Sequence, residues 1–148
     1  MRRYSGNGVT PAGTTLVIGM VVQNGATVRA RIYDLIVSSD SSPADIATKF
    51  SVPRGTVSST GTNFTPTALD PGDPASLLTF KGGTFSGPTI TANSALLFFA
   101  LNQRATFRWV AVPDSELVIP ATTDSWVGVE SLSSGGTPNI DVVALWQE

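Results

Sequence analysis

The sequence lacks two residue types on which much protein chemistry depends. Its 148 residues include no cysteine and no histidine. Without cysteine there can be no disulfide, zinc–thiolate site, iron–sulfur cluster or thiol nucleophile. Without histidine the chain has no Ser-His-Asp triad and loses the most common general base and metal ligand. Charged residues make up only 14%, and Lys49 and Lys81 are the only lysines. We therefore expect no enzymatic activity and no cofactor.

Long hydrophobic runs and an excess of positive charge are also missing. The formal net charge is −2, so no overall field attracts nucleic acid. No apolar run approaches the roughly 20 residues of a membrane-spanning helix. The sequence therefore predicts no direct contact with nucleic acid and no membrane partner.

What is present indicates many short strands. Hydrophobic residues make up 41% of the chain and are interrupted by 14 glycines and 10 prolines. Alternating or β-branched segments recur at roughly the 8–12-residue spacing of sandwiches and barrels, and none has a helical stripe with capping signals. The predicted fold class is all-β, an antiparallel β-sandwich of the jelly-roll type.

The chain divides into an N-terminal arm and one domain. Residues 1–13 carry Gly, Asn and Pro with no apolar period, which predicts an extended arm whose removal leaves the fold intact. Residues 14–148 form a single β-sandwich domain. Residues 14–23 and 27–38 are predicted to pair as a hairpin around Asn24-Gly25. The apolar run at residues 95–101 (ALLFFAL) is predicted to be a buried strand.

The most distinctive short motif is Asp70-Pro-Gly-Asp73-Pro. Two carboxylates three positions apart could contribute to a Ca²⁺ site, which takes six to eight oxygens. A Pro-Gly pair flanked by aspartates is also typical of a β-turn with Asx hydrogen bonds. Because the sequence supplies no third acid nearby, the turn is the favoured interpretation.

Most of the positive charge lies in or beside strands. One interpretation of this arginine set is a phosphate or nucleic-acid site, but such sites have a concentrated basic face. The favoured interpretation is pairing with Asp34, Glu130 or Asp141, between strands or between subunits, because the planar guanidinium holds carboxylates bidentately. The arginines concerned are Arg29, Arg31, Arg104 and Arg108.

Several phrases carry a resemblance to a known family. They are RARIYDLIV at 29–37, SPAD at 42–45, TALDPGDPA at 67–75, LNQRATFRW at 101–109 and LVIPA at 117–121. Together these phrases resemble the head decoration or cement proteins of tailed bacteriophages. The resemblance implies a structural virion protein, made in the bacterial cytoplasm, that forms a homo-oligomer, commonly a trimer, on the outer capsid surface. There it would clamp neighbouring major capsid subunits.

Under this resemblance the arm and the charged residues become interface residues. Arg2, Arg3 and Tyr4 would anchor the arm on a neighbour, since Arg and Tyr are typical interface residues. The other expected interface residues are Arg29, Arg31, Asp34, Asp70, Asp73, Arg104 and Arg108.

Two other functions remain open. The aromatic residues Tyr4, Tyr33, Trp109, Trp126 and Trp146 could stack on sugars, as in a carbohydrate- or receptor-binding β-sandwich of a phage tail or fibre. A metal-assisted hydrolase built on Asp70 and Asp73 is the least favoured, because the chain lacks histidine and cysteine.

Overall fold

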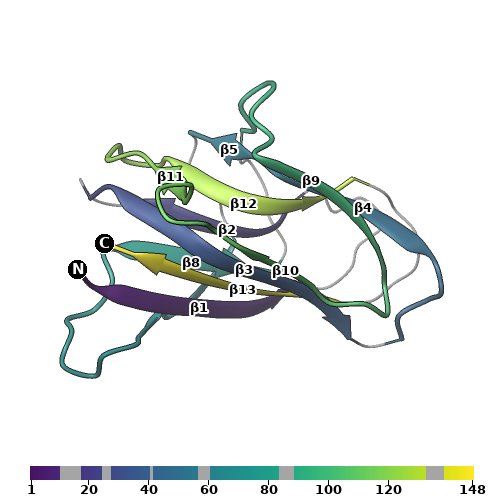
Figure 1. The fold of residues 1–148 in the computed structure, drawn as a ribbon, viewed down its shortest axis with the longest axis horizontal. Helices are drawn as coiled ribbons and strands as arrows, with labels where there is room; N and C mark the ends of the chain where they lie inside the picture. Colours follow the sequence, from purple (N-terminus) through teal and green to yellow (C-terminus); the bar gives the residue numbers. More distant parts are fainter. Residues whose placement is uncertain (11–17, 25–27, 41, 57–60, 84–88, 133–138) are drawn as a thin grey trace.

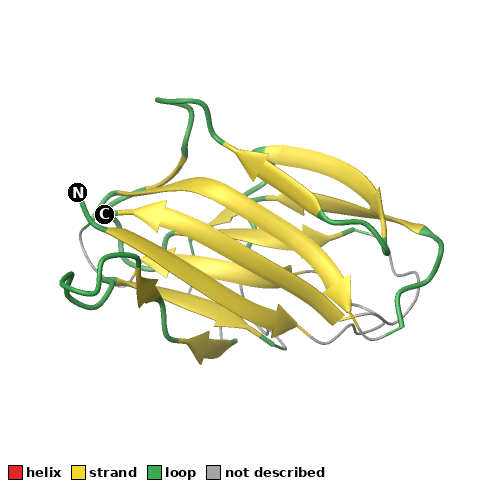
Figure 2. Cartoon of the chain, turned by 60° about the horizontal axis from the view of Figure 1, so that its bottom comes forward, coloured by secondary structure: helices red, strands yellow, loops and turns green. Residues whose placement is uncertain are grey.

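Every regular element in the described part of the chain is a β-strand. The computed structural model describes residues 1–10, 18–24, 28–40, 42–56, 61–83, 89–132 and 139–148. Their strands pair antiparallel and form two sheets that pack against each other (Figures 1 and 2). No helix in these ranges could cross a membrane. The all-β, antiparallel prediction is confirmed.

The first sheet, sheet A, contains the two longest strands of the described chain and both ends of the sequence. Its order is β10 (Phe107–Val110), β3 (Ala30–Asp40), β13 (Asn139–Gln147), β1 (Arg3–Thr10) and β7 (Thr67–Ala68), and β11 (Leu117–Ile119) also pairs with β3. Strand β13 alternates between buried and half-buried positions, and so does most of β3, except that Asp34 and Leu35 are both buried where the pairing with β13 shifts register. This alternation is expected of a sheet with one face in the core.

The second sheet, sheet B, covers the inner face of sheet A. Its order is β6 (Thr62–Phe64), β8 (Leu78–Gly82), β2 (Ile18–Asn24), β12 (Trp126–Ser131), β4 (Ala47–Val52) and β9 (Leu97–Asn102), and β5 (Arg54–Gly55) also pairs with β12. Strands β4, β11, β12 and β13 lie within a few residues of the segments 45–53, 116–119, 125–132 and 139–146, for which the sequence indicates strands.

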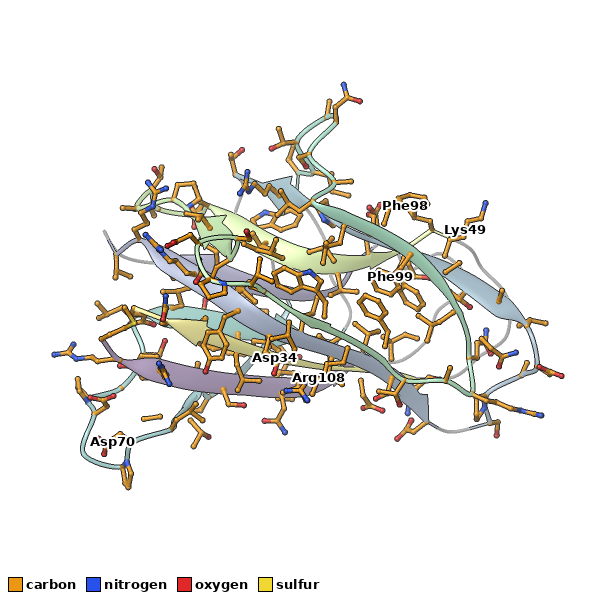
Figure 3. The ribbon with its side chains drawn as sticks, in the orientation of Figure 1. Asp34, Lys49, Asp70, Phe98, Phe99 and Arg108 are labelled. Carbon is orange, nitrogen blue, oxygen red and sulfur yellow. The ribbon has the colours of Figure 1, made fainter. Side chains whose placement is uncertain are left out.

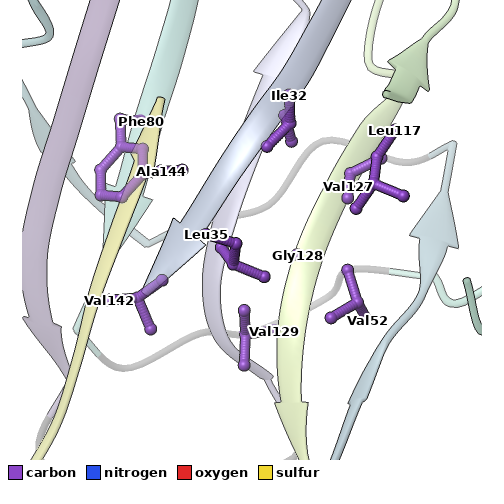
Figure 4. A pocket seen from close by; sticks show the side chains of 10 residues that line it. All are labelled: Ile32, Leu35, Val52, Phe80, Leu117, Val127, Gly128, Val129, Val142 and Ala144. Carbon is purple, nitrogen blue, oxygen red and sulfur yellow. The ribbon is translucent and has the colours of Figure 1, made fainter. Parts of the chain in front are cut away.

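The space between the sheets is filled by apolar side chains. Residues from both sheets surround a residual hollow of only about 10 Å³ (Figure 4). A cavity needs at least about 10–15 Å³ to hold one water molecule. This hollow between the described side chains therefore has room for no more than a single water molecule.

The predicted hairpin around Asn24-Gly25 is wrong. Strand β2 pairs with β8 and β12 in sheet B, whereas β3 pairs with β10, β11 and β13 in sheet A. The chain thus changes sheets between the end of β2 at Asn24 and the start of β3 at Ala30; residues 25–27 lie outside the described residues. An Asn-Gly pair favours a reversal but does not decide which strands pair afterwards.

The predicted N-terminal arm is wrong for Arg3–Thr10, which form β1; residues 11–13 lie outside the described residues. Strand β1 pairs with β13 along its whole length, from Arg3 opposite Gln147 to Thr10 opposite Ile140. Tyr4 is fully buried, and its hydroxyl donates to the carbonyl of Pro74 at 3.0 Å. The segment is therefore part of the sheet. Its backbone is held extended by pairing with β13, although its own Gly-rich sequence has no strand pattern.

An aromatic stack joins β1 to both sheets. The ring of Trp146 lies 6.1 Å from those of Tyr4 and Phe80, and the Trp146 and Phe80 rings are nearly parallel. Phe80, on β8 of sheet B, occupies the space over Gly6, where a Cβ would lie 2.4 Å from the Phe80 ring. The glycine thus serves close approach between the sheets.

The C-terminal residue also holds this region together. The backbones of Arg2 and Glu148 exchange two hydrogen bonds. The Glu148 carboxylate accepts from the Trp146 indole N–H, the Ser76 hydroxyl and the Leu77 amide. The two ends of the chain and the segment before β8 are therefore linked.

The apolar run at residues 95–101 is a strand, but the predicted burial is wrong. It contributes β9, at one end of the order of sheet B. Phe98 on the outer side is 66% exposed, while Phe99 points inward and stacks on Phe107 of β10 at 3.9 Å (Figure 3). A run that is apolar at every position does not reveal which of its faces is covered.

Candidate functional site: the outer face of sheet A

The outer face of sheet A is less polar than the water-facing side of an antiparallel sheet usually is. Strands β3 and β13 direct buried residues inward, among them Leu35, Val37, Val142 and Ala144. The alternating outward positions would ordinarily be polar. On these strands several are aliphatic instead.

Four aliphatic residues form the centre of this face. Ile36 lies directly opposite Val143, and Leu145 lies opposite Asp34, which in turn faces Val110 of β10. Ile36, Val143 and Leu145 are half-buried, and Val110 is 55% exposed. Aliphatic side chains in register across three strands make a continuous apolar surface. We call Ile36, Val110, Val143 and Leu145 the aliphatic centre.

A bidentate ion pair lies within the aliphatic centre. Arg108 donates from Nε to Asp34 Oδ1 at 3.1 Å and from Nη2 to Oδ2 at 2.6 Å (Figure 3). The Asp34 side chain is only 8% exposed, whereas that of Arg108 is 61% exposed. The carboxylate raises the pKa of Arg108 through this hydrogen bond and its charge. The predicted pairing of Asp34 with an arginine is confirmed.

One end of the face is basic. Gln147 of β13 lies between Arg3 of β1 and Arg31 of β3. Arg31 is 3.7 Å from the carboxylate of Glu116, and the Arg3 guanidinium lies over the Tyr33 ring at 6.0 Å. Arg2 directly precedes Arg3, and Arg29 directly precedes the first residue of β3. Both side chains are exposed. Arg3, Arg29 and Arg31, three of the expected interface residues, therefore lie at or next to this end of the face.

The other end is acidic. Asp40 lies opposite Asn139 at the end of β3, and Asp141 lies opposite Ser38. Burial raises the pKa of Asp141, and the charge of Asp40 raises it further. The face therefore has a basic end, an aliphatic centre and an acidic end, in that order along β3.

The acidic end predicts a measurable pH dependence. Since the folded chain binds the Asp141 proton more tightly than the unfolded chain, the contribution of Asp141 is present at low pH and lost as the pH rises through its folded pKa. Asp141→Asn should therefore be more stable than the parent at neutral pH, by up to about 0.5 kcal/mol, with the difference shrinking towards pH 3. Thermal unfolding between pH 3 and 8 measures this. Asp114→Asn, at an exposed turn, is the control, and equal pH profiles for both variants would contradict the assignment.

The Asp34–Arg108 pair predicts a non-additive double mutant. Arg108→Met should lower the midpoint of denaturant unfolding, because it leaves the buried Asp34 carboxylate without its two hydrogen bonds. Asp34→Val combined with Arg108→Met should recover much of the loss, because both charges are then removed together. Denaturant unfolding of both single variants and the double variant tests this. Additive losses would show that the pair is not energetically coupled.

The structure does not bring all the predicted interface residues together. Tyr4 is in the core and cannot be a surface anchor. Arg104 lies in the turn after β9, where its Nε donates to the Pro43 carbonyl at 3.4 Å. Tyr4 is buried because it occupies an inward position of β1, and Arg104 lies elsewhere because β9 belongs to sheet B.

The Asp70–Asp73 segment is the turn that was favoured. The Asp73 amide donates to the Asp70 carbonyl, and the Gly72 amide donates to Asp70 Oδ1 at 2.9 Å. These are the bonds of a β-turn with an Asx cap. No cluster of three or more acidic, His or Cys side chains that could hold a metal occurs among the described residues. With Met1, Arg3 and Leu69, the two aspartates border a surface hollow of about 360 Å³ near the basic end.

The aromatic residues proposed for sugar stacking are largely inaccessible. Tyr4, Trp126 and Trp146 are fully buried. Trp109 and Tyr33 are half-buried, and Trp109 packs against the core. Three of the five side chains that the carbohydrate-binding interpretation invoked therefore present no face to a ligand.

The sequence pattern alone does not single out the aliphatic centre. In residues 139–147 the apolar residues Val143 and Leu145 alternate with the core residues, so they point to the opposite face of the strand. An aliphatic residue there is informative only once the other face of the strand is known to be buried.

Comparison of the chain with protein-family models, with curated proteins and with solved structures returns no match in any of the three.

Proposed function

We propose that this chain is a structural virion protein, a decoration or cement protein of a tailed-bacteriophage head. In this proposal it assembles with two copies of itself as a trimer on the outer capsid surface. It holds neighbouring major capsid subunits together there and catalyses no reaction. The motifs that resemble this family give the virion context, and the outer face of sheet A supplies the attachment surface.

The observation that carries the proposal is the composition of this face. Stable interfaces have a core depleted of charge and a polar rim, and they are enriched in arginine and aromatic residues compared with the rest of the surface. The aliphatic centre, with the mutually paired Arg108 and Asp34 inside it and with Arg3, Arg31 and Tyr33 at one end, matches that composition. An apolar outward face is stabilised when a partner covers it.

The distribution of charge favours contact between copies. If the basic end of one face meets the acidic end of the next, the arginines of one copy lie against Asp40 and Asp141 of another. Such a head-to-tail contact is heterologous and closes into a ring when the rotation permits. A trimer is the smallest such ring above a dimer, so the contact is compatible with the oligomer that the resemblance implies.

We also propose that the two sheets are a jelly roll. A jelly roll folds eight strands so that the first, eighth, third and sixth form one sheet and the second, seventh, fourth and fifth form the other. If the short strands and β8 are set aside, the orders β1-β13-β3-β10 and β2-β12-β4-β9 follow this scheme. Jelly rolls are common in viral capsid proteins, so this strand order supports the same proposal.

Introducing a negative charge into the aliphatic centre tests the proposed function. The parent chain should have the mass of a trimer by multi-angle light scattering and should cosediment with empty phage heads that lack a decoration protein. Val143→Asp places a carboxylate in the middle of the face, and we expect a monomer that no longer cosediments but unfolds at nearly the parent temperature. Arg31→Met should weaken assembly more than Lys81→Met, which lies in sheet B.

The matched control is Ala100→Asp, which introduces the same charge at an exposed outward position of β9 in sheet B. We expect this variant to assemble and cosediment as the parent does. A parent chain that stays monomeric at all concentrations and ignores phage heads would rule the proposal out. So would equal effects of Val143→Asp and Ala100→Asp.

A further inference from the structure

Strand β9 forms an open edge of sheet B. It is the last strand in the order of that sheet, and in the described part of the chain only β4 pairs with it. The Gln103 amide donates to the Ile46 carbonyl at 3.0 Å, in register with the β4–β9 ladder. Hydrogen-bonded and non-hydrogen-bonded pairs alternate along an antiparallel ladder. The odd-numbered residues of β9 therefore turn their backbone N–H and C=O groups towards β4, and the even-numbered Phe98 and Ala100 turn theirs away from it.

This edge lacks the features that usually protect an edge strand. Protected edge strands are commonly very short, or they carry charged residues or proline. Strand β9 has six residues, LFFALN, with no charge and no Pro. The strands at the other sheet ends, β6, β7 and β10, have three, two and four residues. Phe98 and Ala100 are both exposed (Figure 3), so their outward backbone groups are accessible to another strand.

The open backbone groups of β9 are self-complementary. Phe98 and Ala100 are placed symmetrically on either side of Phe99. If two β9 strands lie antiparallel about a two-fold axis at Phe99, Phe98 of each copy is opposite Ala100 of the other, and the two exchange both of their backbone hydrogen bonds. A large side chain then lies beside a small one on the outer side of the sheet. The two Phe99 side chains become neighbours on the inner side, and aromatic cross-strand pairs of this kind are stabilising.

The charges near the edge also suit a second copy. Ser51 of β4 lies between Glu130 and Phe98, and Lys49 of β4 lies opposite Ala100. In the two-fold arrangement, one row across the joined sheets runs through Glu130, Ser51 and Phe98 of one copy and then Ala100 and Lys49 of the other. The ends of each row carry opposite charges, so the pairing brings no like charges together within a row.

We propose that β9 pairs with β9 of a second copy in this way, so that sheet B continues from one molecule into the next. A two-fold contact uses the same edge of both copies, so each β9 has one partner only. A strand of six residues offers less than the roughly 800 Å² per partner of a standard interface. The contact is therefore weak, with a dissociation constant on the order of 100 µM. The inference does not rest on the proposed function, because the trimer and its attachment to phage heads use sheet A.

The exchange of backbone amide hydrogens with water, followed by NMR on the full-length, ¹⁵N-labelled chain, tests this contact. A contact of this strength is mostly open at about 20 µM chain and mostly closed at about 1 mM. We expect the Phe98 and Ala100 amides to exchange about fourfold more slowly at the higher concentration, since only the open edge exchanges. The Phe99 and Leu101 amides already bond to β4, so their rates should be equal at both concentrations.

Two results of this measurement would overturn the proposal. One is an exchange rate of the Phe98 and Ala100 amides that does not change with chain concentration. The other is a slowing that appears only when empty phage heads are added, which would assign the edge to a head subunit.

Two variants at one position test the backbone contact itself. Ala100→Pro removes the outward N–H without removing a bond to β4, and proline is tolerated at such edge positions. We expect the Phe98 amide of this variant to exchange at the same rate at both concentrations. Ala100→Ser keeps the N–H and should behave as the parent does, so slowing that persists in Ala100→Pro would contradict the proposal. The measurement on the parent chain needs no variant, so a folding defect in Ala100→Pro would not obscure it.

Ala100→Asp separates this contact from the proposed function. It places a carboxylate beside Phe98 of the second copy, so we expect the fourfold slowing to disappear. The same variant is expected to form the trimer and to cosediment with phage heads, because both use sheet A. The pairing of β9 and the attachment through sheet A are thus measured independently in one variant.

Discussion

Gly6→Val should destabilise the protein by at least about 3 kcal/mol, the upper part of the range for overpacked cores. Gly6 faces inward from β1, and a Cβ there would lie 2.4 Å from the buried Phe80 ring. Phe80 cannot retreat easily, because it is stacked on Trp146 across the two sheets. Two further methyl groups would force β1 away from sheet B. Denaturant unfolding followed by tryptophan fluorescence measures the loss.

The matched control is Asn7→Val, one residue further along the same strand. Asn7 is exposed on the outer side of β1, opposite Val143. Valine suits a half-exposed strand position, so the change should be within about 0.5 kcal/mol of the parent. Equal effects of the two substitutions would mean that β1 does not pack inward through Gly6. A loss confined to Gly6→Val would establish the strand and its orientation together.

Deletion of residues 1–10 should abolish cooperative folding. The deletion removes β1 from between β13 and β7 and uncovers Trp146 and Phe80. It also removes the backbone bonds between Arg2 and Glu148. Losing a paired strand and the burial of Tyr4 amounts to much of the roughly 5–15 kcal/mol that stabilises an ordinary domain. Far-UV circular dichroism and thermal melting should show no unfolding transition in the truncated chain.

Complementation separates this structural role from that of a docking arm. A synthetic peptide of residues 1–10, added in trans, should restore a melting transition whose midpoint rises with peptide concentration. The same peptide carrying Gly6→Val should fail to do so. A truncated chain that melts cooperatively by itself would return the segment to the role of a dispensable arm, which its sequence suggested.

Strands β1 and β13 pair with each other, but the sequence pattern reveals only β13 as a strand. Residues 139–146 alternate regularly, so the sequence places Ile140, Val142, Ala144 and Trp146 on one face, and the structure buries that face. Residues 3–10 offer Gly6 and Gly8 at the inward positions instead of apolar side chains. A glycine contributes nothing to a hydrophobic pattern, so a strand whose inner face is filled by aromatic rings from the other sheet looks like a loop.

The candidate site was predictable only in part. That arginines would pair with Asp34 followed from their side-chain chemistry and from their positions in strands. That Arg108 would be the partner depends on β10 lying beside β3, with Arg108 opposite Ile36. The aliphatic centre likewise needs β3, β10 and β13 in register.

The amino-acid sequence alone determined that this chain would be built of short antiparallel strands. Its β-branched and alternating segments have the period of strands, and Gly and Pro interrupt them before a helical pattern can extend. It also determined which chemistries lack their side chains. The tertiary structure decided which strands became neighbours, that residues 3–10 belong to a sheet, and which outward positions gather into one face. Strand pairing joins residues as far apart as Arg3 and Gln147, and a local pattern carries no information about a partner at that distance.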